Sequence, residues 1–134
     1  MKLGMLALLA LLWTVPVLAG PAEDEATAAA KTWIALIDAK NYPQSWKDAA
    51  DIFQQGVSET KWDEMVQSGR DKAGALKSRQ FQSAQLTKSL PGVPDGDYAV
   101  VSFQSDFETK GASTEVLTLV HENGKWKVGG YFIQ

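Results

Sequence analysis

The chain has 134 residues, a formal net charge of −3 and no cysteine. The lack of cysteine excludes disulfides and thiolate metal sites, and interspersed charges without a basic run argue against nucleic acid and anionic lipid surfaces as partners. Apolar packing must therefore stabilise the fold, and the length predicts one domain.

Residues 1–19 carry the features of a secretory signal peptide. A positive N-terminus precedes an apolar run over Leu3–Trp13, and Val17 and Ala19 occupy the −3 and −1 positions of a cleavage site. A proline shortens the run below the roughly 17–25 apolar residues of a membrane span, although an uncleaved anchor is the alternative. We expect cleavage after Ala19, a periplasmic or secreted protein with no membrane span after cleavage, and a single domain over residues 20–134.

Three amphipathic helices are predicted next. The first, over residues 22–40, has an apolar stripe at helical spacing: Ala26, Ala29, Ala30, Trp33, Ile34 and Ile37. The second, over residues 43–55, ends at Gly56 in a left-handed conformation. The third begins at Ser58, a good N-cap, and its stripe is Trp62, Met65, Val66 and Gly69. We interpret the tryptophans on these helices as core residues rather than as a stacking box for a ring or sugar.

Beyond Gly74 the apolar spacing becomes alternating and predicts strands over residues 75–90, 97–107, 114–122 and 125–134. The first is polar and predicts an edge strand with a bulge near residues 82–84. Asn123-Gly124 predicts a type I′ hairpin, and Gly129-Gly130 a bulge or sharp bend. Helices followed by strands predict an α+β fold, with three N-terminal helices packed on a curved four-stranded antiparallel sheet.

The turn over residues 89–97 contains two prolines, two glycines and two aspartates. Asp95 and Asp97 offer two carboxylates, whereas calcium takes about six to eight oxygen ligands. Pro91-Gly92 suits a type II turn, so we interpret the segment as a corner of the chain rather than a metal loop. We expect no metal and no cofactor.

The sequence also resembles a known family. The segments that carry the resemblance are WIALID from Trp33, YPQSW from Tyr42, SLPGVPDGDY from Ser89 and GKWKVGGY from Gly124. They resemble the bacterial domain-of-unknown-function family 4019, whose members look like exported proteins without an established activity. The ending on a curved sheet is also similar to the nuclear-transport-factor-two-like cone fold. This second resemblance implies a pocket between the helices and the sheet.

Few side chains qualify as acid–base groups. His121 is the only histidine, and we expect it to be exposed near a hairpin tip. Glu115 shares strand parity with inward-facing leucines, so a buried pair with Arg79 or Arg70 is one interpretation, but an exposed strand-end glutamate is the interpretation we favour. Asp38 either caps the turn after its helix or points into the cone mouth.

These observations predict a non-enzymatic small-ligand-binding or interaction domain, with no catalytic residue assigned. The alternatives are an isomerase or dehydratase that uses Glu115 or Asp38 as base, and a pure protein-interaction module of the cell envelope. Partners would be a small molecule or an envelope protein. The residues expected to line a cavity or its mouth are Tyr42, Trp46, Arg79, Glu115 and Tyr131.

Overall fold

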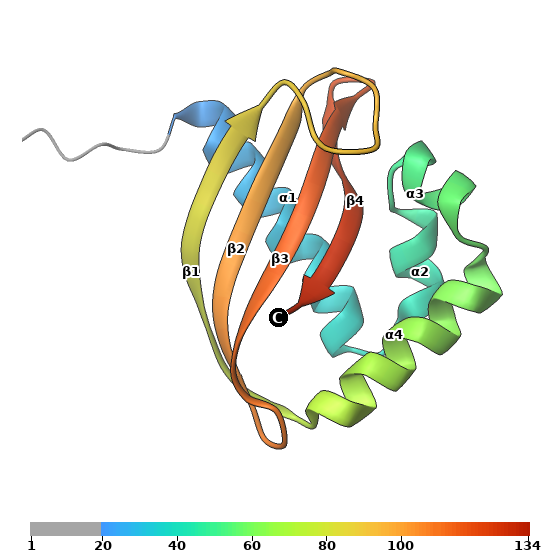
Figure 1. Ribbon diagram of the computed structural model, residues 1–134, viewed down its shortest axis with the longest axis vertical. Helices are drawn as coiled ribbons and strands as arrows, with labels where there is room; N and C mark the ends of the chain where they lie inside the picture. The colour runs from blue at the N-terminus through green and yellow to red at the C-terminus, as the bar shows by residue number, and fades with distance from the viewer. Residues whose placement is uncertain (1–19) are drawn as a thin grey trace, which may run out of the picture.

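The structure, a computed structural model, describes residues 20–134; the predicted signal peptide lies outside the described residues. Four helices precede four strands, which confirms the α+β class (Figure 1). The elements are α1 (Pro21–Asp38), α2 (Tyr42–Lys47), α3 (Asp51–Gly56), α4 (Glu59–Ala73), β1 (Leu76–Thr87), β2 (Tyr98–Phe107), β3 (Gly111–Glu122) and β4 (Lys125–Ile133). Among the described helices, none has the length and apolar character needed to span a membrane.

The strands form one four-stranded antiparallel sheet, as predicted, and their order in it is β1-β2-β3-β4. Helix α1 crosses one face of the sheet, and α2, α3 and α4 lie beyond the β4 edge (Figure 1). The core lies between α1 and the alternate residues of the strands that face it. It includes the α1 stripe Ala26, Ala30, Trp33, Ile34 and Ile37, and the sheet residues Ala99, Val101, Phe103, Leu117, Leu119 and Val128.

The predicted second helix is wrong as a single element, because the chain forms α2 and α3 instead. Ala50 between them is extended, with φ −62° and ψ 155°. Its N–H donates to the carbonyl of Val128 on β4 at 2.8 Å, which ties this break to the sheet. The Gln54 side chain donates to the carbonyls of Trp46 and Lys47 at 3.0 Å and so satisfies the end of α2.

The predicted irregularities of the strands are confirmed. Gln82 is skipped between the pairs formed by Phe81 and Ser83, and Gly129 is skipped between Val128 and Gly130, so each is a bulge. Asn123 and Gly124 both have positive φ, 51° and 75°, as a type I′ hairpin requires.

Two helix-end predictions have opposite outcomes. The Ser58 side chain accepts a hydrogen bond from the Lys61 N–H at 3.2 Å, which confirms the predicted N-cap of α4. Gly56 ends α3 as predicted, but it is not among the positive-φ glycines of the described residues, so its predicted left-handed conformation is wrong. The chain leaves α3 through an extended Val57 instead.

Candidate functional site

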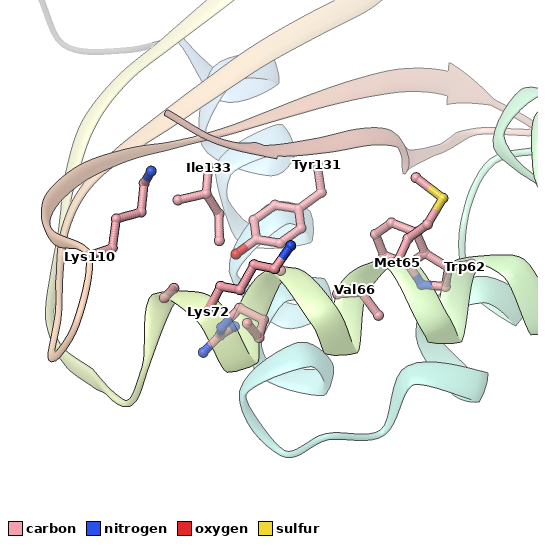
Figure 2. Close-up of a pocket in the computed structure, with 10 residues that line it drawn as sticks. Trp62, Met65, Val66, Lys72, Lys110, Tyr131 and Ile133 are labelled. Carbon is pink, nitrogen blue, oxygen red and sulfur yellow. The ribbon is translucent and has the colours of Figure 1, made fainter.

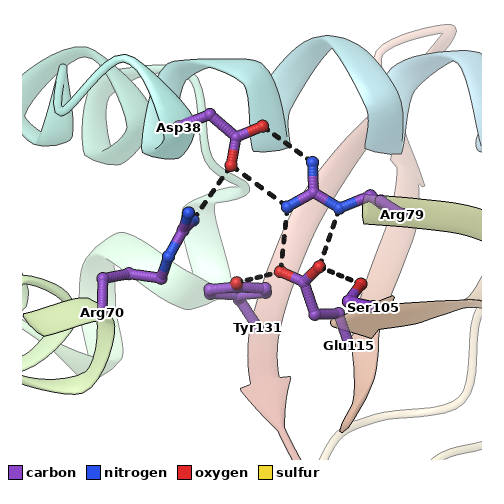
Figure 3. Close-up of polar contacts among 6 residues, drawn as sticks. All are labelled: Asp38, Arg70, Arg79, Ser105, Glu115 and Tyr131. Atoms are coloured by element: carbon purple, nitrogen blue, oxygen red, sulfur yellow. Dashed lines mark hydrogen bonds and ion pairs between the residues drawn. The ribbon is translucent and has the colours of Figure 1, made fainter. Parts of the chain in front are cut away.

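Glu115 on β3 is fully buried, with 0% of its surface exposed, at the centre of a polar network (Figure 3). Both of its oxygens accept hydrogen bonds from the Arg79 guanidinium on β1, from Nε at 2.7 Å and from Nη2 at 3.2 Å. The hydroxyls of Ser105 and Tyr131 donate to the same carboxylate. Register explains the meeting, because β2 Ser105 pairs with β1 Arg79 and β3 Glu115 lies on the same face. A buried carboxylate requires such partners.

A second carboxylate completes the network from the C-terminal end of α1. Asp38 accepts from Arg79 at 2.7 and 3.1 Å and from Arg70 of α4 at 3.0 Å. Arg79 therefore bridges two carboxylates with its planar fork, which suits guanidinium geometry. Two carboxylates and two guanidinium groups balance in charge, and the network joins α1, α4, β1 and β3 (Figure 3).

The network shifts the pKa values of Asp38, Arg79 and Tyr131. Burial opposes ionisation of Asp38, but hydrogen bonds and charge from Arg79 and Arg70 outweigh it and lower the pKa of this carboxyl. Burial alone would lower the pKa of Arg79, yet its bonds to Asp38 and Glu115 raise it. Burial and the adjacent Glu115 carboxylate raise the pKa of Tyr131. These groups are therefore held ionised, or for Tyr131 neutral, across the neutral pH range.

Tyr131 also forms part of a rigid aromatic wall. Its ring meets Trp33 edge-on with centroids 5.7 Å apart, and Trp33 lies 6.0 Å from Trp62. Both indoles are anchored on buried Ser45: Trp33 Nε1 donates to its carbonyl at 2.8 Å and Trp62 Nε1 to its hydroxyl at 2.9 Å. The hydrogen bond from its hydroxyl to Glu115 and the contact of its ring with Trp33 thus hold Tyr131 in one orientation.

A pocket of about 440 Å³ opens beside this wall, between α4 and β4. Figure 2 shows Tyr131 and Ile133 projecting from β4 toward α4, with Trp62 and Met65 at one end, Lys110 at the other and the Lys72 side chain between them. The volume falls within the range of about 300–1,000 Å³ typical of small-molecule sites. Arg70 belongs to this wall as well, so the pocket and the polar network share two residues.

The cationic end of the pocket is tied together through the backbone. The N–H groups of Thr109 and Lys110, in the β2–β3 turn, donate to the Ala73 carbonyl at 3.0 Å, and Glu108 N–H donates to the Ala75 carbonyl at 2.8 Å. The two bonds to Ala73 satisfy the last carbonyl of α4, and together the three bonds hold the Lys110 turn against the end of the helix.

Comparison with protein families assigns the chain. Residues 29–131 match the family described as "Protein of unknown function (DUF4019)". The chain belongs to this family. The match confirms the family resemblance drawn from the sequence, whereas a comparison with curated proteins found no match. The resemblance to the cone fold stays a prediction.

The structure brings three of the five expected site residues together: Arg79, Glu115 and Tyr131. The favoured interpretation of Glu115 as exposed is wrong, because strand parity and the Arg79 partner outweighed the general preference of glutamate for solvent. Tyr42 is buried at the start of α2, and Trp46 donates its indole N–H to the Val57 carbonyl at 2.8 Å. Neither lines the pocket between α4 and β4.

Other candidate residues have clear placements. Asp38 points into the network rather than capping its turn, and the Asn41 N–H donates to the Leu36 carbonyl. His121 is exposed near the β3–β4 hairpin, as predicted. Asp97 pairs with Lys88 in the corner after β1, and the described residues contain no group of three or more His, Cys, Asp or Glu able to hold a metal.

The sequence prediction missed the residues that define the pocket. Met65 is 53% exposed and Gly69 is exposed, although both belong to the predicted α4 core stripe. No sequence pattern links Lys72 and Lys110, because they are 38 residues apart in the chain and line the same pocket only in the folded protein.

Proposed function

We propose that this protein is a non-enzymatic binding domain, exported to the periplasm or beyond, whose small-molecule ligand occupies the pocket between α4 and β4. The observation that carries the proposal is a concave, largely apolar pocket with a wall fixed in advance. Tyr131 and Arg70 are held from behind by Glu115 and Asp38, so little side-chain order has to be gained on binding. Preorganisation of this kind favours affinity.

The same contacts speak against the isomerase or dehydratase alternative. A general base needs an available lone pair and a pKa near the working pH. Glu115 already accepts from Arg79, Ser105 and Tyr131, and the pKa of Asp38 is lowered rather than raised. A charge-balanced network whose carboxylates already accept several hydrogen bonds is better suited to holding a pocket wall than to moving protons.

The interaction-module alternative requires a contiguous apolar patch. The large exposed apolar side chains within residues 20–134 are Met65, Phe81, Leu86 and Phe132, which lie on α4, β1 and β4. Phe81 and Phe132 belong to opposite faces of the sheet by their register with Phe103 and Val116. This distribution favours a small ligand over a broad protein partner. The proposal also includes export, which the signal-peptide pattern of residues 1–19 supports, and a cone-like curvature of the sheet, which Gly129-Gly130 supports.

Native mass spectrometry on the protein purified without denaturation from its own host tests the proposal. We expect a co-purifying small molecule. Gly69→Phe should abolish the adduct, because a Cβ at Gly69 meets no atom within 4 Å and the new ring would fill the pocket. Gly56→Phe is the matched control, since its Cβ is equally free and Gly56 lies outside the pocket. A bare protein, or an adduct that Gly69→Phe retains, would refute this site.

A further inference from the structure

The pocket between α4 and β4 has a cationic end in an acidic protein. The full chain has a net charge of −3, yet Arg70, Lys72 and Lys110 line the pocket and no carboxylate of the described residues does. Neither lysine forms an ion pair anywhere within residues 20–134. Arg70 is only 11% exposed, and its Nε is buried without a hydrogen-bond partner in that same part of the chain.

Helix stability accounts for only part of this charge. Arg70 and Lys72 lie in the last turn of α4, where cations complement the helix dipole. Lys110 comes from a different element, the turn between β2 and β3. The Ala73 carbonyl at the helix end is already satisfied by Thr109 and Lys110 backbone N–H groups. Arg70 is paired with Asp38, whereas Lys72 and Lys110, from two different elements, line the pocket without an ion-pair partner within residues 20–134.

The opposite end of the pocket is apolar. Trp62, Met65 and Val66 line it, and Met65 is half exposed at this end. Trp62 and Lys72 are ten residues apart on α4, which at a rise of about 1.5 Å per residue separates the apolar and cationic ends by roughly 15 Å. Figure 2 shows Trp62 and Met65 at one end of the groove and Lys110 at the other, with Tyr131, Ile133 and the Lys72 side chain between them.

We propose that the ligand is a single-tailed anionic amphiphile. Its acidic head group, a carboxylate or another singly charged oxyanion, lies between Lys72 and Lys110, and its apolar tail runs along Val66 toward Trp62 and Met65. This inference rests on the proposed small-molecule site and names the chemical class that the site selects. Ammonium groups bind oxyanions as point charges, and the apolar residues at the other end of the groove suit an apolar tail.

Isothermal titration of the protein with three ligands of equal chain length tests the class: decanoate, decanol and decyltrimethylammonium. Decanoate should bind best, and added salt should weaken it more than decanol. Lys72→Gln/Lys110→Gln should lower decanoate affinity roughly tenfold, the effect of two partly exposed ion pairs, and leave decanol affinity unchanged. Lys47→Gln/Lys61→Gln removes two exposed lysines outside the pocket and should change neither.

The possible results separate this inference from the proposed function. Equal binding of all three ligands, insensitive to the lysines, would overturn the anionic class while leaving the pocket as a binding site. No binding of any of them, together with a co-purifying adduct that Gly69→Phe removes, would also overturn the class alone. If that adduct is absent as well, both proposals fail. Binding to anionic phospholipid vesicles without binding of free decanoate would overturn the free-ligand assignment.

Discussion

Breaking the Glu115–Arg79 pair from one side should destabilise the fold strongly. Glu115→Leu leaves the Arg79 guanidinium, 14% exposed, with Asp38 as its remaining partner, and it leaves the hydroxyls of Ser105 and Tyr131 without their acceptor. Removing one partner of a buried pair costs about 3–5 kcal/mol. Arg79→Met should cost a similar amount, because it leaves the Glu115 carboxyl, at 0% exposure, without its cationic partner.

The double variant Glu115→Leu/Arg79→Met should cost far less than the sum of the single variants. Neither residue of the double variant leaves a buried charge behind, so the interaction energy should be about 3 kcal/mol or more. For an m value of about 1.5 kcal/mol/M, each single variant would lower the urea midpoint by roughly 2–3 M. Equilibrium urea unfolding followed by tryptophan fluorescence measures all three changes.

An exposed pair supplies the control. Lys77 and Asp106 lie 3.7 Å apart with side chains 61% and 42% exposed, so Lys77→Gln should change the free energy of unfolding by less than about 1 kcal/mol. Costs below about 1 kcal/mol for Glu115→Leu, or strictly additive single variants, would refute the account of the network as a coupled, buried unit.

Further predictions concern glycines, pH and processing. Gly74→Ala should destabilise the fold by about 1–3 kcal/mol in urea unfolding, because φ at Gly74 is +82° and a Cβ there would lie 2.7 Å from Thr109 Oγ1. Gly69→Ala in α4 should instead stabilise the fold by about 0.5–1 kcal/mol. Equal effects of the two substitutions would contradict this reasoning. Because the pKa of Tyr131 is raised above 10.0, stability should decline as pH rises past about 10, when only the unfolded chain releases this proton. Tyr131→Phe should weaken that decline, and an unchanged pH profile would count against the buried phenol. Intact-mass analysis of protein recovered from the host should find a chain that starts at Gly20; a chain that retains Met1 would contradict cleavage.

Much of the fold was predictable because its signals are local. Each of these signals depends on residues that are close together in the sequence. They are the α1 stripe, the Ser58 cap, the Asn123-Gly124 hairpin and the bulge at Gly129. The split between α2 and α3 was missed because its cause is distant: Ala50 donates to Val128 across the fold. Local helical propensity cannot report such a bond.

The site was predictable only in part for the same reason. Strand parity offered burial of Glu115, paired with Arg79 or Arg70, as one interpretation, but exposure was the favoured one. The choice depends on the β1–β2 register that places Arg79 beside Ser105. The convergence of Lys72 and Lys110 depends on the backbone bonds between the end of α4 and the β2–β3 turn. Neither can be read from residue spacing in one sequence.

The most direct test of the account is a two-dimensional NMR titration of the protein with decanoate, followed at the indole N–H signals of Trp62 and Trp126. Trp62 lines the pocket between α4 and β4, and Trp126 lies in a separate pocket beside His121. If the amphiphile binds in this pocket, the Trp62 signal should shift saturably while the Trp126 signal stays in place. Gly69→Phe should suppress the shift. A titration that moves Trp126, or neither signal, would contradict the claim that this pocket binds an anionic amphiphile.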